Sequence, residues 1–411
     1  MIRIISEEEA PTVLGRSVDR VGEAMGISAP IVADVRLRGD EALKEYRQRF
    51  DLVALDEPLY LDAGGELEAN LQQAVEQASR NIQSFAEAQL VTSWMSEFSD
   101  GRSLGQLVRP LNSVGVYVPA GRYPLISTLL MAVIPAQVAG VPNIVVACPH
   151  PSREILAVAK MLGVKQILHA GGAQAIAAMA YGTESVKPVQ RIVGPGNAYV
   201  AAAKKLVSQD VAIDFVAGPS EILIVASQGN AQWIAADMLA QAEHDVDARA
   251  ILLTTDKEFA LRVQAEIEIQ LSSLSTVQIA QRAIIDNSAI VVCDTTDSAF
   301  NLVNTIAPEH LSVEQKSDIE RVNSAGSIFV GQYSTEAAGD YASGPNHILP
   351  TSGNAAVRGG LSVNDFVKVI TVQELSKTAL SELEPAVTAL ARAEGLEAHA
   401  RSVETRNDAT A

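Results

Sequence analysis

The sequence predicts an α/β protein whose sheets are largely parallel. Between about residues 113 and 331, short runs rich in β-branched side chains alternate with segments of about 10 to 20 residues that have a helical period. This alternation is typical of parallel strands joined by helices that cover the sheet. A chain of 411 residues can bury a large core and is expected to form two or more domains.

The predicted elements follow one another along the chain. Helices are expected first, over 30–49 and 66–90. The runs that read as strands are 114–118, 144–147, 166–169, 191–193, 222–225, 250–254, 290–293 and 327–330. Helical segments between them include 154–162, 173–180, 197–207 and 231–244. A stretch rich in Gly, Ser and Pro over 339–360 then interrupts the pattern, and one long charged helix is predicted from 374 to about 402.

These elements predict two α/β units and two terminal segments. One unit spans about 117–219, and the second is assembled from its flanks, about 13–116 with 220–362. Residues 1–12 and 363–411 remain outside these units and are expected to be dimerising segments.

The composition fits a soluble metabolic enzyme and argues against several classes of partner. The 31 Lys and Arg residues against 49 Asp and Glu give a formal charge of −18. Such a negative field repels phosphate backbones and anionic membranes, so nucleic acid is not an expected partner. No uninterrupted apolar run reaches the roughly 18 residues of a membrane span, and the N-terminus lacks the architecture of a signal peptide. We therefore expect a cytoplasmic protein with no membrane partner.

Two cysteines limit the choice of metal ligands. Cys148 and Cys293 each end an apolar run, where a cysteine usually acts as a small buried hydrophobic residue. A metal site in this chain is therefore expected to use nitrogen and oxygen ligands.

The stretch from Ile213 to His244 is the most informative part of the sequence. It combines the turn Ala217-Gly-Pro-Ser-Glu221, a buried strand and a helix that carries Gln241 and His244. Side chains three residues apart on a helix project from one face, so this pair can share a ligand. Alone, a Gln-x-x-His pair is weak evidence for a metal, because solvated helix faces often carry such pairs.

A glycine-rich turn at 194–199 imitates a dinucleotide-binding fingerprint. The sequence Gly-Pro-Gly-Asn-Ala-Tyr follows a predicted strand and opens a helix, and Asp214 lies 20 residues after Gly194. The imitation fails at the third glycine, where Tyr199 would block close packing of the helix, and Pro195 removes a backbone donor. A standard dinucleotide site is therefore not expected here.

The segment Ala307-Pro-Glu-His-Leu311 supplies a candidate acid–base pair. Pro308 ends the preceding helical run, so Glu309 and His310 are expected at a junction leading into a short strand. A neutral imidazole can take and return an alcohol proton near pH 7, and a carboxylate can activate water. The plainer alternative is a Glu-His pair on the surface.

Together these motifs resemble those of the histidinol dehydrogenases, the zinc- and NAD-dependent enzymes of the last steps of histidine biosynthesis. The stretch 213–244 is similar to the signature segment of that family, and further motifs match in order along almost the whole chain. The resemblance implies two incomplete Rossmann-like domains with largely parallel sheets, plus N- and C-terminal dimerising segments. It also implies that NAD is bound without the standard fingerprint, by Tyr117, Gln174 and Asn197. From the sequence alone, each of these three also reads as a polar residue that caps a turn.

The resemblance further implies a zinc site and a set of substrate contacts. The matched zinc ligands, for one ion per subunit, are Gln241, His244, Asp340 and His399. The matched substrate contacts are Ser220, Gln241, His244, Glu309, His310, Asp340, Glu394 and His399.

The reaction that the resemblance implies is the oxidation of L-histidinol to L-histidine through histidinaldehyde, with two NAD⁺. His310 would serve as general base and acid in both oxidations, and Glu309 would activate the water that hydrates the aldehyde. Glu394 and His399 would complete the site of the partner in a homodimer. Two alternatives remain open: a relative with the same core that oxidises another small alcohol, and a non-enzymatic α/β binding protein such as a two-lobed solute receptor.

Overall fold

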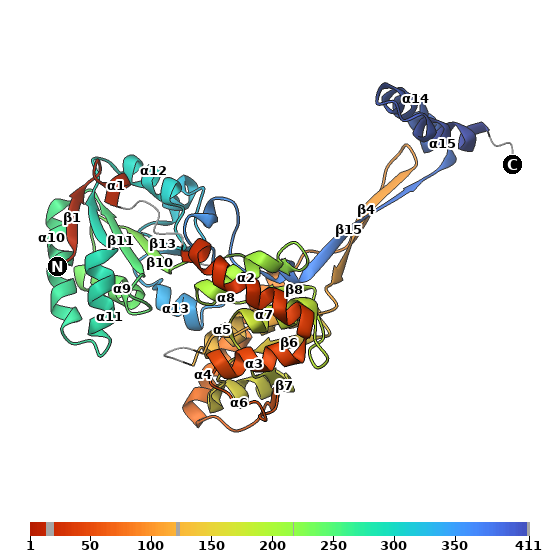
Figure 1. Cartoon of the computed structure of the whole chain (residues 1–411). Coiled ribbons are helices and arrows are strands. Elements are labelled where there is room, and N and C mark those ends of the chain that lie inside the picture. The colour runs from red at the N-terminus through yellow and green to blue at the C-terminus, as the bar shows by residue number, and fades with distance from the viewer. Residues whose placement is uncertain (14–19, 121–123, 217, 409–411) are drawn as a thin grey trace. The chain divides into compact units, whose positions relative to one another are not determined.

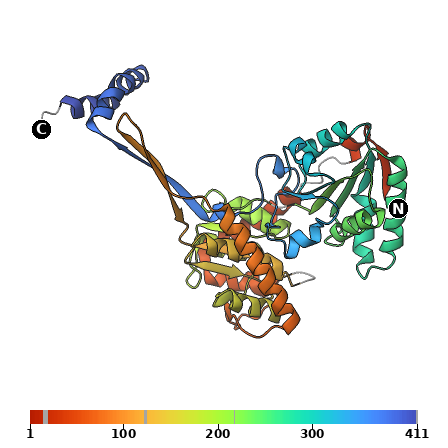
Figure 2. The same cartoon turned by 180° about the vertical axis from the view of Figure 1, so that it is seen from behind.

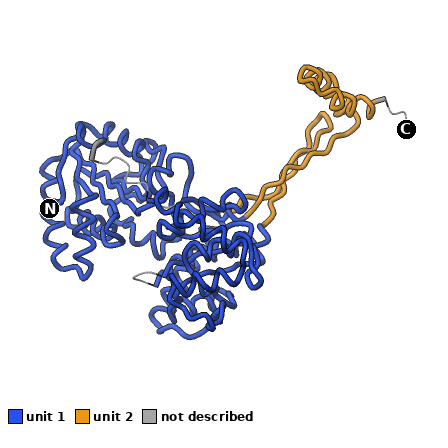
Figure 3. The backbone as a smooth tube through the Cα atoms, in the orientation of Figure 1, with its two compact units in different colours: residues 1–89, 111–366 blue, residues 90–110, 367–411 orange. Residues whose placement is uncertain are grey.

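The computed structural model describes residues 1–13, 20–120, 124–216 and 218–408. The chain divides into two compact units, which are residues 1–89 with 111–366 and residues 90–110 with 367–411 (Figure 3). None of the helices in the described part of the chain combines the length and the apolar character that a membrane span requires.

The first unit contains a six-stranded parallel sheet, called here the first sheet (Figure 1). Its strands lie in the order β1-β12-β11-β10-β13-β14. Their bounds are Arg3–Ser6 (β1), Glu221–Val225 (β10), Arg249–Thr254 (β11), Ala289–Val292 (β12), His310–Val313 (β13) and Ser327–Val330 (β14). The helices of this part are α1 (Ala10–Val13), α9 (Ala231–Ala242), α10 (Lys257–Leu271), α11 (Val277–Asp286), α12 (Thr296–Ile306), the 3-10 helix η1 (Lys316–Arg321) and α13 (Glu336–Tyr341).

Both faces of the first sheet are buried, each in its own core cluster. Successive side chains of a strand point to opposite faces, so one strand contributes to both clusters. Ile222 and Ile224 of β10 pack with Met238 of α9 in one core cluster. Leu223, between them, packs with Phe300 of α12 in the other. A strand covered on both sides carries a continuous apolar run, which is why the sequence shows these strands clearly.

The first unit also contains a second six-stranded sheet, in the order β2-β7-β6-β5-β8-β9. Strand β2 is antiparallel to β7, and the other pairs are parallel. The strand bounds are Tyr60–Asp62 (β2), Val114–Tyr117 (β5), Ile144–Ala147 (β6), Gln166–Leu168 (β7), Arg191–Val193 (β8) and Ala212–Ile213 (β9). The helices are α2 (Arg20–Arg38), α3 (Asp40–Phe50), α4 (Ala69–Gln89), α5 (Ile126–Val138), α6 (Arg153–Met161), α7 (Gly172–Tyr181) and α8 (Ala198–Val207), and the 3-10 helices η2 (Asn354–Ala356) and η3 (Val363–Phe366) follow later in the chain. The two sheets confirm the predicted α/β class.

One predicted helix in this unit is divided in two. The segment 30–49 spans the end of α2 and most of α3, with Gly39 between them at φ 59°. This backbone conformation suits glycine and interrupts the helix.

The two cysteines are free and buried, as predicted, and burial raises the pKa of Cys148 and Cys293 to about 12.

The second unit is an antiparallel ribbon followed by a pair of helices. The ribbon has the order β15-β4-β3, and Figure 2 shows its two long strands side by side. The bounds are Trp94–Glu97 (β3), Arg102–Pro110 (β4), Val367–Leu375 (β15), Lys377–Ala393 (α14) and Glu397–Asp408 (α15).

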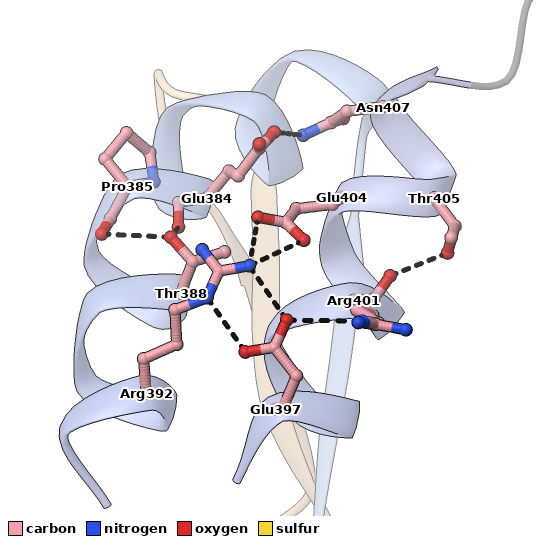
Figure 4. A network of polar contacts seen from close by, with 9 residues as sticks. All are labelled: Glu384, Pro385, Thr388, Arg392, Glu397, Arg401, Glu404, Thr405 and Asn407. Carbon is pink, nitrogen blue, oxygen red and sulfur yellow. Dashed lines mark hydrogen bonds and ion pairs between the residues drawn. The ribbon is translucent and has the colours of Figure 1, made fainter. Parts of the chain in front are cut away.

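The prediction of one long helix from 374 to 402 is wrong. Glu374 belongs to β15, where it pairs with Ser103, and Gly395, at φ 77°, separates α14 from α15. The two helices pack against each other and share a polar network (Figure 4). In it the Arg392 guanidinium donates to the carboxylates of Glu397 and Glu404.

Candidate active site

Glu309 and His310 lie where α12 ends and β13 begins. Ala307 closes α12 with φ 51°, in the left-handed region, so the chain leaves the helix sharply. Strand β13 starts at His310, which is paired with Ile222 of β10. The predicted junction is therefore present, at the amino-terminal edge of the first sheet.

Glu309 is a buried carboxyl that accepts two hydrogen bonds. Its Oε2 accepts from the Ser220 hydroxyl at 2.7 Å and from the backbone N–H of Glu221 at 2.8 Å. Burial outweighs these bonds and raises the pKa of Glu309 to about 8. The neighbouring Glu221 carboxyl, 3.5 Å from Arg249, is also buried, and burial raises its pKa to about 7. A carboxyl that titrates near neutral pH can accept and return a proton.

The two ring nitrogens of His310 have different surroundings. The Nδ1–H donates to the backbone carbonyl of Glu221 at 3.1 Å. Nε2 is buried without a hydrogen-bond partner among the described residues, 3.7 Å from a carboxylate oxygen of Asp340. Burial lowers the pKa of His310, which favours the neutral ring. The Glu-His pair is therefore not on the surface.

His244, Glu336 and Asp340 form a cluster whose ligand atoms lie within 4.8 Å of one another. His244 Nε2 is 3.7 Å from a carboxylate oxygen of Asp340. Glu336 and Asp340 share one face of α13, because they are four residues apart. His244 lies just beyond the end of α9, and not on that helix as predicted.

The Gln241 amide, in the last turn of α9, joins the same cluster. The side chain is fully buried. In the orientation that satisfies its neighbours, its NH₂ group donates to the Glu336 carboxylate, and its oxygen lies 2.8 Å from the Ser220 hydroxyl, whose one proton serves either this oxygen or Glu309. Three of the four predicted metal ligands, Gln241, His244 and Asp340, therefore converge.

The sequence reasoning missed Glu336. The signal that could have found it is its spacing from Asp340 in Glu336-Ala-Ala-Gly-Asp340, one helical turn. Together the cluster offers imidazole nitrogen, carboxylate oxygen and amide oxygen, a donor set that suits zinc.

A small cavity adjoins the cluster. Its lining residues are His310, Ser327, Phe329, Gly339, Asp340, Pro345, Asn346, His347 and Leu349. The Nδ1–H of His347 donates to the backbone carbonyl of Asp340 at 2.6 Å, and burial lowers the pKa of this histidine. His310 and Asp340 thus line the same cavity, to which Phe329 also contributes.

Glu394 and His399 belong to the second unit. Glu394 caps the carboxyl end of α14, and His399 lies in the first turn of α15. Both side chains are exposed. All the clustered residues belong to the first unit, so a role for Glu394 and His399 in the same site stays a prediction.

The three predicted NAD contacts lie around the carboxyl ends of β5, β7 and β8, and each has an internal partner. The Tyr117 hydroxyl accepts from the backbone N–H of Gly172 at 3.2 Å. The Gln174 amide donates to the Asp51 carboxylate at 3.2 Å. Asn197 caps α8, since its side-chain oxygen accepts from two backbone N–H groups of the first turn. The capping role read from the sequence is therefore present for Asn197, and NAD binding by the three residues stays a prediction.

Asp214, which stands where a dinucleotide fingerprint has its acidic residue, is directed into the protein. Its carboxylate accepts from the backbone N–H groups of Gly194 at 2.8 Å and Phe215 at 2.6 Å, and it forms an ion pair with Lys204. A side chain with three internal partners is not available to a ribose hydroxyl. This agrees with the failure of the fingerprint in the sequence.

Comparison with known proteins identifies the family. The family model described as histidinol dehydrogenase matches residues 15–407. A histidinol dehydrogenase of Geobacillus kaustophilus is 48% identical over 391 residues, which cover 92% of each chain. One from Bacillus subtilis is 44% identical and covers 96% of each. The crystal structure of histidinol dehydrogenase from Elizabethkingia anophelis superposes with a TM-score of 0.94 at 36% identity, covering 98% of each chain. The chain therefore belongs to the histidinol dehydrogenase family, whose members are NAD-dependent oxidoreductases that act on alcohol and aldehyde groups.

Proposed function

We propose that this chain oxidises L-histidinol to L-histidine through histidinaldehyde, in a zinc-dependent reaction that uses two NAD⁺. The observation that supports it most directly is the position of His310 Nε2, which is buried, lacks a hydrogen-bond partner within the described part of the chain and lies 3.7 Å from Asp340, at the edge of the nitrogen and oxygen cluster. A base that faces a cluster of nitrogen and oxygen atoms suited to bind a metal can act on an alcohol that lies between the base and the cluster.

The proposed zinc ligands are Gln241, His244 and Asp340 of one subunit, with His399 of the other. The Glu336 carboxylate accepts a hydrogen bond from the NH₂ group of Gln241. The amide oxygen of Gln241 is then the atom of this side chain that would bind the metal. When bound, zinc would orient the substrate through its imidazole and amino nitrogens.

In the first oxidation His310 would accept the hydroxyl proton of histidinol at Nε2, and the carbon that bears this hydroxyl would give up a hydride, for which NAD⁺ would be the acceptor. The neutral ring is ready for this step, because burial lowers the pKa of His310 and Nδ1 already carries the proton donated to Glu221. The product of the step would be histidinaldehyde, and His310 would return its proton to solvent before the second oxidation.

In the second oxidation Glu309 accepts a proton from the water that adds to the aldehyde carbon. The hydrate then loses a hydride to a second NAD⁺ and a proton to His310, which yields the carboxylate of histidine. Burial raises the pKa of Glu309 to about 8, so its ionised form is a stronger base than an ordinary carboxylate, and the Ser220 hydroxyl holds the carboxyl in place at 2.7 Å. Four electrons leave the substrate, two with each hydride.

For the cofactor we propose contacts from Tyr117, Gln174 and Asn197, at the carboxyl ends of the second sheet, where ligands of α/β proteins usually bind. The domain boundaries are proposed as 117–219 for the NAD-binding domain and 13–116 with 220–362 for the zinc and catalytic domain, with 1–12 and 363–411 as dimerising segments.

We also propose that the protein is a homodimer with shared sites, in which Glu394 and His399 complete the site of the partner. Their exposure in the single chain supports this, because a metal ligand and a substrate contact would otherwise face solvent.

The test is the stoichiometry of NADH formed from limiting L-histidinol in the presence of excess NAD⁺ and zinc. Two NADH for each histidinol consumed, with histidine as the product, are expected. A single NADH with the aldehyde as the end product would contradict the four-electron reaction. Faster oxidation of an unrelated small alcohol would favour the alternative substrate.

A further inference from the structure

Lys204 and Asp214 form a buried ion pair in the part of the chain that carries the second sheet. Lys204 lies on α8 and Asp214 directly follows β9. The side chains are 2% and 0% exposed, respectively. Burying two charges costs desolvation energy that their attraction often only offsets, so such a pair is weak evidence for a role in stability alone. The contacts of the pair indicate another role.

The pair holds both backbone groups of Gly194. The Asp214 carboxylate accepts from the Gly194 N–H at 2.8 Å, and the Lys204 ammonium donates to the Gly194 carbonyl at 2.9 Å. Gly194 directly follows β8 and starts the turn that leads to α8. The position of this turn is therefore set by two side chains that come from outside it.

The same turn is confined on its other side by Tyr117. A Cβ on Gly194 would overlap the Tyr117 backbone carbonyl, and the φ of Gly194 is 114°. Only glycine fits such a close approach in this backbone region. The turn ends at Asn197, which caps α8. Gly194, which the ion pair holds, thus sets the position of Asn197 relative to Tyr117. These are two of the three proposed NAD contacts.

We infer that Lys204 and Asp214 are positioning residues for the dinucleotide, which fix the turn from Gly194 to Asn197 against Tyr117. This inference rests on the proposed function of Tyr117 and Asn197. Neither Lys204 nor Asp214 would itself contact the cofactor, because both side chains are buried and their polar groups are directed to Gly194, to Phe215 and to each other. The acidic residue of the imitated fingerprint therefore shapes the cofactor turn instead of binding a ribose.

The decisive variant is Lys204→Met combined with Asp214→Asn, which removes both charges together and leaves neither unpaired. The zinc-loaded full-length protein is used, and NADH binding is measured by fluorescence beside the steady-state constants. We expect Kd for NADH and KM for NAD⁺ to rise roughly tenfold, with KM for L-histidinol and zinc content unchanged. Lys204→Arg keeps the charge and a donor, so its KM for NAD⁺ should rise by only about threefold.

Ser288→Ala is the matched control for a purely structural effect. Ser288 is fully buried directly before β12, and its hydroxyl accepts from the backbone N–H of Ala250 in β11 and donates to the backbone carbonyl of Ala283 in α11. Its loss should lower the thermal midpoint and leave NADH binding unchanged. If the double variant is folded and binds NADH as the wild type does, the inference is overturned. If the double variant does not fold, an unchanged KM for NAD⁺ in Lys204→Arg overturns it.

Asn197→Ala separates this inference from the proposed function. If Asn197→Ala binds NADH normally, the proposed cofactor site has failed, whatever the ion pair does. If Asn197→Ala weakens NADH binding and the double variant does not, only the positioning role has failed.

Discussion

The side chain of His310 can act as a base because its two nitrogens are already distinguished by their surroundings. The backbone carbonyl of Glu221 accepts the Nδ1–H at 3.1 Å, which directs the lone pair to Nε2. Burial lowers the pKa of the ring, so the lone pair stays free near neutral pH. Glu309, one residue earlier, has the opposite shift, since burial raises the pKa of a carboxyl. The same desolvation thus leaves His310 ready to accept an alcohol proton and Glu309 able to exchange protons with water.

The division of work between Glu309 and His310 can be tested on separate substrates. His310→Ala should lower the rate of both oxidations by roughly 10² to 10⁴, because both release a proton to this ring. Glu309→Gln should slow the oxidation of histidinaldehyde much more than that of histidinol, because hydration of the aldehyde precedes the second step alone. Single-turnover NADH traces from each substrate measure the two effects. Equal losses on the two substrates for Glu309→Gln would contradict the assignment.

A pH effect on stability is expected at Asp237, a residue of α9 that accepts a hydrogen bond from Thr335. Burial raises its pKa from 3.8 to about 6. Between these values the folded protein keeps a proton that the unfolded chain has lost, so this group makes stability fall as the pH rises through that window. Above about pH 6 the charged form carries the full desolvation penalty.

Asp237→Asn should therefore stabilise the protein at pH 8 relative to wild type, by about 1 kcal/mol after allowing for partial exposure, and by much less at pH 4.5. Urea unfolding midpoints of the zinc-free protein at the two pH values provide the measurement. A variant that is less stable than wild type at pH 8 would show that the hydrogen bond from Thr335 outweighs the desolvation.

At the scale of elements, the site depends on two short helical ends and two strand ends. The last turn of α9 supplies Gln241, and α13 supplies Glu336 and Asp340 from one face. Strands β10 and β13 are neighbours in the first sheet, which brings Ser220 beside Glu309 although they are far apart in the sequence. Parallel pairing therefore assembles residues that no local motif could bring together.

Removal of one imidazole should show whether this cluster holds the metal. His244→Ala should lower zinc affinity by more than about 100-fold, since a nitrogen ligand is lost. His150→Ala, an exposed histidine of the same chain, is the control and should retain zinc. Zinc should also leave the wild type as the pH falls through roughly 6, because the ligand imidazole must be neutral. Metal analysis after dialysis decides, and full activity after complete removal of the metal would contradict the site.

The sequence predicted the buried elements better than the exposed ones. The runs at 222–225 and 250–254 appear clearly because both of their faces are covered. In the ribbon of the second unit, most side chains of β15 are exposed, and the β-branched run over 367–372 is a strand signal that the prediction left unused. The charged composition after 374 predicts one helix, but Gly395 divides this segment into two helices.

Within the candidate site, the sequence predicted the residues with motifs and missed those that depend on tertiary contacts. Glu309 and His310 were recognised from a proline-marked junction, and the structure places both beside the metal-type cluster. Glu336 becomes evident through its contact with Gln241 and its place beside His244 and Asp340, because its four-residue spacing from Asp340 is by itself a weak signal. Glu221 contributes to His310 through its backbone carbonyl, an interaction that no side-chain motif can predict.

At the scale of the whole molecule, the central claim is that two chains build each active site. The cluster of Gln241, His244 and Asp340 lies in the first unit, and Glu394 and His399 lie exposed in the second. Such a three-ligand site could obtain a fourth ligand, the imidazole nitrogen of His399, and a substrate-binding carboxylate, that of Glu394, from a partner. Closed two-fold symmetry would then give two equal sites.

Complementation between two inactive variants tests this claim most directly. His310→Ala and His399→Ala chains are unfolded together and refolded in equal amounts with zinc, and NADH formation from L-histidinol is measured. Under two-fold symmetry each mixed dimer has one doubly altered site and one intact site, so activity should recover to about a quarter of wild type, because half the dimers are mixed. Each variant refolded alone is the control and should stay inactive. If the mixture remains inactive although mixed dimers are shown to have formed, every site is built from a single chain and the shared site is contradicted.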